Sequence, residues 1–176
     1  MKYYKKSLGQ NFLIDKNIIR KITSIVKVRN QNIIEIGPGK GAITCEILKL
    51  KPKTLSVIEK DPSLAKELKK KFLKKKNVFI YNQDILNFNI EKICKKNSIV
   101  FGNLPYNISS QILIKILNFK DWPPNIKDVI FMFQKELGEK IIGKFTSKHY
   151  GRLSILANFR LFIINNFLVS PNCFFP

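Results

Sequence analysis

The stretch "NIIEIGPGKGAITCEILKL" (residues 32–50) decides the fold. Its first part, "NIIEIG", is a short apolar run typical of a buried strand, and its last part, "GAITCEILKL", has apolar residues at helical spacing. Between them lie three glycines, Gly37, Gly39 and Gly41. Glycines allow a tight turn and let a ligand lie against bare backbone. A strand joined to a helix by such a loop predicts the first unit of a ligand-binding α/β sheet.

Apolar runs and amphipathic stretches alternate along the rest of the chain, as a parallel α/β sheet requires. The pattern predicts strands at 32–37, 54–60, 77–84, 98–103 and 128–134, and a sixth strand within 156–169. It predicts helices at 16–27, 41–50, 62–76, 109–119 and 135–144. No repeat or linker divides the chain. We therefore expect residues 1–176 to form one α/β domain with a doubly wound, mostly parallel sheet.

The charge balance indicates the class of partner. The chain has 32 Lys+Arg against 12 Asp+Glu, a formal net charge of +20. Such a charge attracts polyanions and favours nucleic acid over a membrane, although a coding bias toward lysine is the alternative explanation. Three scattered cysteines and one histidine suggest no metal site and a reducing compartment. The basic start lacks the apolar stretch of a signal peptide and no segment predicts a membrane span, so a cytoplasmic protein is expected.

Two carboxylates accompany the glycine loop and favour one kind of cofactor. The loop reads G-x-G-x-G, whereas a dinucleotide fold favours G-x-G-x-x-G. Glu59 closes the second predicted strand, where its carboxylate can accept hydrogen bonds from both ribose hydroxyls. Asp84 closes the third, where it could accept one from an adenine amino group. These features favour S-adenosylmethionine, an adenosine-containing cofactor without a diphosphate, over a nicotinamide cofactor.

The fourth predicted strand runs into "GNLPYNISS" (102–110), which can neither extend the strand nor begin a helix at once. If the substrate is an exocyclic adenine amine, the Asn103 side-chain oxygen and a main-chain carbonyl next to Pro105 could accept its two hydrogens. This would aim the nitrogen lone pair at a methyl donor and stabilise the developing positive charge. Tyr106 would stack on the extruded base. The alternative is a simple turn with a packed tyrosine.

Seven blocks, in this order, resemble one known family. They are "LGQNFL" (8–13), "EIGPGKGAIT" (35–44), "VIEKD" (57–61), "NQDIL" (82–86), "FGNLPYNISS" (101–110), "FMFQKE" (131–136) and "YGRLS" (150–154). Together they are similar to the KsgA-type ribosomal RNA adenine N6,N6-dimethyltransferases, over essentially the whole chain. The resemblance implies the Rossmann-like fold of the class I methyltransferases that use S-adenosylmethionine.

The resemblance also assigns roles to residues of this chain. It implies that Asn103, Pro105 and Tyr106 serve the reaction, and that Phe174, from "PNCFFP" (171–176), covers the second face of the flipped adenine. It implies cofactor contacts from Asn11, Leu13, Gly37, Glu59, Asp84 and Asn103. Within that set Gly37 would lie against the methionine part, Glu59 would bind the ribose and Asp84 the adenine.

The family's substrate and domain plan give further expectations. The implied substrate is a pair of adjacent adenines in a hairpin near the 3′ end of small-subunit ribosomal RNA, in a small-subunit precursor, with the enzyme acting as a monomer. Alternatives are a large-subunit methyltransferase of the macrolide-resistance type, a non-catalytic RNA-binding or assembly protein, and a DNA adenine methyltransferase. Family members continue beyond the position of Pro176 with a last strand and a helical domain. The chain is therefore expected to lack both.

Overall fold

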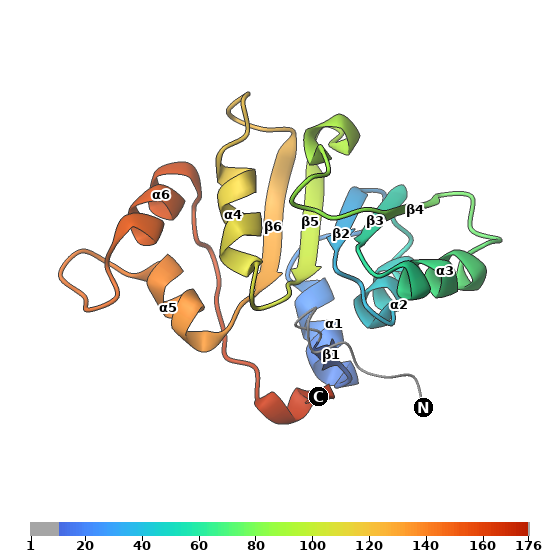
Figure 1. Cartoon of the computed structure of the whole chain (residues 1–176), viewed down its shortest axis with the longest axis horizontal. Helices are drawn as coiled ribbons and strands as arrows, with labels where there is room; N and C mark the ends of the chain where they lie inside the picture. Colours follow the sequence, from blue (N-terminus) through green and yellow to red (C-terminus); the bar gives the residue numbers. More distant parts are fainter. Residues whose placement is uncertain (1–10, 176) are drawn as a thin grey trace.

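A five-stranded parallel sheet forms the centre of the structure, a computed structural model that describes residues 11–175 (Figure 1). Its strand order is β4-β3-β2-β5-β6. The bounds are β2 Asn32–Ile36, β3 Thr54–Glu59, β4 Val78–Asn82, β5 Ser98–Asn103 and β6 Ile126–Met132. All four pairings are parallel. The five strands predicted before residue 135 are therefore confirmed, with ends that differ by up to two residues.

Helices cover both faces of the sheet, which confirms the doubly wound architecture. Successive residues of a strand face opposite sides, so Ile33 belongs to one core cluster and Ile34 to another. The first cluster includes side chains of α1 (Lys16–Ser24), α2 (Ala42–Lys49) and α3 (Pro62–Lys71). The second includes side chains of α4 (Ser109–Leu117) and of the short 3-10 helix η2 (Ile90–Ile93). Helix α4 also packs against α5 (Lys135–Ile142) and α6 (Arg152–Arg160).

The topology brings the ends of three strands together. From β2 the chain proceeds through β3 to β4, and then returns to place β5 on the other side of β2. In the register, Ile36 lies beside Ile58 of β3 and Gly102 of β5. The loops that follow these strands therefore meet at the point where the strand order reverses, which is where open α/β sheets bind ligands.

The predicted sixth strand within 156–169 is wrong. Residues 152–160 form α6, in which Ser154 and Ala157, one helical turn apart, are fully buried. Residues 161–170 have no regular secondary structure. A strand is stable only when its backbone groups pair with a neighbour. Among residues 11–175 the outer edge of β6 pairs with no strand, so this segment finds no ladder, and Phe162 and Ile164 are 97% and 85% exposed.

Two short strands join the ends of the described chain. β1 (Phe12–Leu13) pairs in antiparallel fashion with β7 (Phe174–Phe175), which follows the 3-10 helix η3 (Pro171–Cys173). The Cys173 carbonyl accepts hydrogen bonds from the backbone N–H groups of Ile14 (2.9 Å) and Asp15 (3.2 Å). The segment after β1 then enters α1, whose N-terminus is capped by the Asp15 carboxylate.

No helix between residues 11 and 175 is both long enough and apolar enough to cross a membrane. Over the same part of the chain, His, Cys, Asp and Glu side chains do not gather in groups of three or more that could hold a metal ion.

Candidate active site

A cleft of about 620 Å³ opens at the carboxyl ends of β2, β3 and β5. Its volume is within the range of sites for small molecules and cofactors. Its lining includes seven of the residues predicted from the sequence to form the site: Asn11, Leu13, Gly37, Glu59, Asp84, Asn103 and Pro105. Because these residues come from five separate segments, the fold brings together what the sequence places up to 94 positions apart.

The glycine loop forms the part of the cleft wall that has no side chains. Gly37, Gly39 and Gly41 have φ angles of 67°, 57° and 79°, in the left-handed region that favours glycine. A Cβ at Gly39 would lie 2.7 Å from the Phe12 ring, so no side chain fits there. A Cβ at Gly37 would lie 3.4 Å from the Asn103 carbonyl oxygen, which shows how closely this loop approaches the end of β5. The loop leaves backbone accessible to a ligand.

Glu59 ends β3 and is 6% exposed. Its Oε2 accepts a hydrogen bond from the Gly39 N–H (3.1 Å), and its Oε1 accepts one from the Asp61 N–H (2.8 Å). Burial raises the pKa of Glu59, and these backbone donors only partly offset the rise. A carboxylate has more lone-pair sites than these two bonds use, so Glu59 can still accept hydrogen bonds from ligand hydroxyls.

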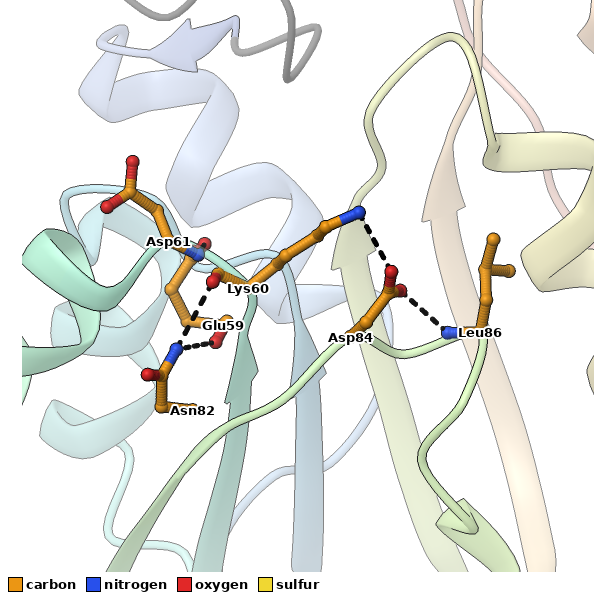
Figure 2. A network of polar contacts seen from close by, with 6 residues as sticks. All are labelled: Glu59, Lys60, Asp61, Asn82, Asp84 and Leu86. Atoms are coloured by element: carbon orange, nitrogen blue, oxygen red, sulfur yellow. Dashed lines mark hydrogen bonds and ion pairs between the residues drawn. The ribbon is translucent and has the colours of Figure 1, made fainter.

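Asp84 lies beyond the end of β4 and is held by two partners (Figure 2). Lys60 Nζ lies 2.8 Å from one carboxylate oxygen, and the Leu86 N–H donates to the other at 3.0 Å. The hydrogen bond from Lys60 is the largest cause that lowers the pKa of Asp84, so the group is an anion at neutral pH. Nearby, the Asn82 amide donates to the carbonyls of Glu59 (2.9 Å) and Lys60, which fixes the ends of β3 and β4 relative to each other (Figure 2).

Glu35 also belongs to the cleft lining, and the sequence pattern gave it no role. It lies inside β2 and is 1% exposed, and its Oε2 accepts no hydrogen bond from the residues that the structure describes. Burial raises the pKa of Glu35 to about 7. Hydrogen bonding with Thr44 partly offsets this rise, and repulsion from the Glu59 carboxylate adds to it. An unpartnered acidic oxygen in a ligand-sized cleft suits a ligand that carries positive charge.

Asn103, the last residue of β5, is tied to the N-terminal segment. Its Nδ2 donates a hydrogen bond of 2.8 Å to the main-chain carbonyl oxygen of Asn11. Pro105 also lines the cleft, beside Gly37. The predicted Asn-Leu-Pro turn therefore does face the glycine loop.

The two aromatic residues predicted to hold a base lie outside the lining of this cleft. Tyr106 is half-buried, and Phe174 packs against the core cluster that contains Leu13. The neighbour Phe175 lines the cleft instead and is 51% exposed. Of the "QNFL" block, Gln10 lies outside the described residues, while Asn11–Leu13 lie in the lining.

Sequence reasoning missed an aromatic and cationic group at the cleft. Lys40 Nζ of the glycine loop lies 4.8 Å from the centre of the Phe12 ring and 5.5 Å from that of Phe175. Both distances are within the range of cation–π attraction. The position of Lys40 between two loop glycines was a signal in the sequence. Only the tertiary structure shows that β1 and β7 bring the Phe12 and Phe175 rings to it.

Comparison with known proteins identifies the family. The sequence model described as "Ribosomal RNA adenine dimethylase" matches residues 1–176. The chain belongs to this family. A relative from Pelagibacter ubique, named "Ribosomal RNA small subunit methyltransferase A", is 47% identical over 98% of this chain and 65% of its own length. One of the same name from Mycoplasmopsis synoviae is 41% identical over 98% of this chain and 64% of its own length. The chain thus spans just under two thirds of the length of these relatives.

Solved structures agree with the assignment to this dimethylase family. A dimethyladenosine transferase from Plasmodium falciparum matches with a TM-score of 0.71 and 29% identity, over 84% of this chain and 52% of that one. The 23S rRNA methyltransferase ErmE matches with a TM-score of 0.64 and 28% identity, over 77% of this chain and 52% of that one. With the observed sheet, these matches confirm the predicted class I methyltransferase fold.

Proposed function

We propose that residues 1–176 form the catalytic domain of an S-adenosylmethionine-dependent ribosomal RNA adenine N6,N6-dimethyltransferase. Its substrate would be two adjacent adenines in a hairpin near the 3′ end of small-subunit ribosomal RNA. One observation carries the proposal: in a chain of this family, Asn103 lines the same cleft as the glycine loop, Glu59 and Asp84.

The cleft suits S-adenosylmethionine on structural grounds. Bare backbone at Gly37 and Gly39 leaves room that a Cβ would fill, and the unpartnered Oε2 of Glu35 suits a cationic ligand. Glu59 would accept hydrogen bonds from the ribose hydroxyls, and Asp84 would accept one from the adenine amino group. Asn11 and Leu13 would cover the ligand from the N-terminal side. When bound, this cofactor supplies a methyl group on a positively charged sulfur.

The chain's own residues would prepare the target amine. The Asn103 side-chain oxygen and the main-chain carbonyl next to Pro105 would accept its two hydrogens, which directs the nitrogen lone pair into the cleft. The same oxygens would stabilise positive charge that develops on the nitrogen, so no general base is needed before attack. We assign the two faces of the adenine to Tyr106 and Phe174. Because the Phe174 side chain packs on the core here, this role requires that side chain to leave the core on RNA binding while the pairing of β1 with β7 is kept.

The charge of the chain supports RNA as the partner. In addition to the net charge of +20, six cationic side chains are in the cleft lining: Lys16, Arg20, Lys40, Lys49, Lys60 and Lys71. Phosphates need only cationic groups within reach, so these residues could hold the strand that delivers the base. We expect RNA affinity to fall steeply with salt.

The names of the relatives favour the small subunit over the large one, because both of the sequence relatives described above are named for the small-subunit enzyme. We propose that the edge of β6, which pairs with no strand among residues 11–175, can accept a further strand beside the exposed segment 161–168. We further propose that the protein acts as a cytoplasmic monomer.

A labelling experiment tests the proposed function. The chain would be incubated with methyl-labelled S-adenosylmethionine and, separately, with immature small-subunit particles, naked small-subunit RNA, large-subunit RNA and DNA. Dimethyladenosine only in small-subunit RNA is the expected product, and Asn103→Ala is the matched inactive control. Label in large-subunit RNA or in DNA would reassign the substrate. Tight RNA binding with no label from the wild-type chain would show a binding protein that keeps the fold.

A further inference from the structure

We propose that the main-chain carbonyl of Asn11 is a positioning group for methyl transfer, because it fixes the orientation of the Asn103 side-chain amide. This inference rests on the proposed function and adds to it a contact between two segments 92 residues apart. The Asn11 carbonyl oxygen would thus determine whether Oδ1 or Nδ2 of Asn103 faces the substrate.

The distance between the two groups determines the orientation of the amide. The Asn11 carbonyl oxygen lies 2.8 Å from Asn103 Nδ2, a normal hydrogen-bond length. A carbonyl can only accept, so the side-chain atom at this distance must be the NH₂ group. Turning the amide over would bring two acceptor oxygens, with no hydrogen between them, to the same distance. The Asn11 carbonyl therefore selects one of the two amide orientations.

The selected orientation leaves Oδ1 as the available atom of Asn103. Among residues 11–175 no other hydrogen bond from the Asn103 side chain is present, and the residue is half-buried in the cleft lining. An adenine amine offers hydrogens, so it needs an acceptor. With the amide reversed, Asn103 would present NH₂ to NH₂, and the target amine would be repelled. The orientation set by Asn11 is the productive one.

The Asn11 carbonyl is held by the segment that follows it. Phe12 and Leu13 pair with Phe175 and Phe174, and the backbone after them donates to the Cys173 carbonyl. Leu13 is 3% exposed in the core, which prevents the strand from sliding. Residues 173–175 therefore act on Asn103 through Asn11, although none of the three donates to or accepts from the Asn103 side chain within the described chain.

The carbonyl can be weakened without changing any side chain. Replacing Phe12 by its α-hydroxy acid converts the bond after Asn11 into an ester, whose carbonyl is a poorer acceptor. The matched control replaces Leu13 by its α-hydroxy acid and alters the next bond instead. In ¹⁵N-labelled protein, we expect the Asn103 amide protons to exchange with water about fivefold faster in the first variant and unchanged in the control. This measurement needs neither cofactor nor RNA.

Methyl transfer is measured on the same proteins. We expect the first variant to transfer about fivefold more slowly at saturating cofactor and RNA, with both affinities and the control rate unchanged. Faster amide exchange with an unchanged rate would overturn the positioning role, and so would equal effects in both esters. If the wild-type chain transfers no methyl group to any RNA, the proposed function and this role fail together, while the exchange data still decide whether Asn11 holds the amide.

A second variant tests orientation through pH. In Asn103→Asp, an ionised carboxylate would oppose the Asn11 carbonyl, whereas the protonated acid could donate to it and keep one oxygen as acceptor. We expect transfer by this variant to rise about tenfold per pH unit of acidification above the carboxyl pKa, relative to wild type. A flat ratio to wild type would overturn the proposal.

Discussion

Glu35 offers a test of the electrostatics of the cleft that is independent of any activity. The perturbation is Glu35→Gln, which keeps the shape of the side chain and removes its titration. In the folded protein, burial raises the pKa of Glu35 from 4.5 to about 7. With about 1.4 kcal/mol for each pH unit, this rise corresponds to about 3 kcal/mol.

The sign follows from where the proton is held. Below pH 4.5 both the folded and the unfolded chain hold the proton on Glu35, so the group costs nothing. Between pH 4.5 and about 7 the folded chain binds more protons than the unfolded one, so the free energy of unfolding falls as the pH rises. The full loss, about 3 kcal/mol, is reached above the folded pKa. The variant has no such loss.

Urea denaturation of both proteins from about pH 4.5 to about pH 8.5 measures the effect. The free energy of unfolding of Glu35→Gln minus that of wild type should increase by about 3 kcal/mol over this range, because the titration of all other groups largely cancels in the difference. Glu91→Gln, at an exposed position of the 3-10 helix η2, is the matched control for the same change of side chain outside the core. A difference for Glu35→Gln that stays constant with pH would show that Glu35 is not buried as a neutral acid, and would refute the reasoning.

Three further predictions concern the cleft and the open edge of the sheet. Gly39→Ala should weaken S-adenosylmethionine binding at least about tenfold, measured by calorimetry, and lower the free energy of unfolding by about 1–3 kcal/mol, because its Cβ meets the Phe12 ring and its φ is positive. The control is Gly138→Ala in α5, where no atom lies within 4 Å of the new Cβ. In the same calorimetry and denaturation assays it should be neutral or stabilising by up to about 1 kcal/mol. Asp84→Ala should reduce cofactor affinity about tenfold or more by calorimetry, and equal affinity in this variant and wild type would contradict the adenine role. Lys60→Met removes only an exposed partner of Asp84 and should change the free energy of unfolding by less than about 1 kcal/mol. Phe162→Lys should lower aggregation, followed by light scattering, and leave the free energy of unfolding within about 0.5 kcal/mol, because the ring is 97% exposed; a larger loss would mean that this ring is packed.

Local patterns predicted the elements that depend on their own residues. The helix predicted at 62–76 forms at Pro62–Lys71, because proline suits the first turn; the structure adds the Asp61 carboxylate as its cap. The glycine loop was recognisable because its positive φ angles favour glycine whatever lies around it. The segment 156–169 was predicted wrongly because apolar β-branched and aromatic residues favour a strand, but a strand also needs a partner, and among the described residues β6 has none on its outer side.

The site could be predicted only as a set of residues at strand ends. Glu59, Asp84 and Asn103 share one cleft because parallel strands end at the same edge, and this rule needs only the order of strands and helices along the chain. The partners of these residues could not be predicted. Nothing in the sequence pairs Lys60 with Asp84, leaves Glu35 Oε2 without a donor among the described residues, or brings Phe175 rather than Phe174 to the cleft.

The sequence by itself determined the order of strands and helices, the glycine turn and the acidic and amide residues that end the strands, because each depends on the local spacing of apolar side chains or on one residue's backbone preferences. Only the tertiary structure decided the chemical state of the site: which carboxyl group has its pKa raised by burial, which is paired with a cation, and which way the Asn103 amide faces. Burial and hydrogen-bond geometry depend on atoms from distant segments, and the contact of Asn11 with Asn103 across 92 positions exists only once the segment at Asn11 lies against the end of β5.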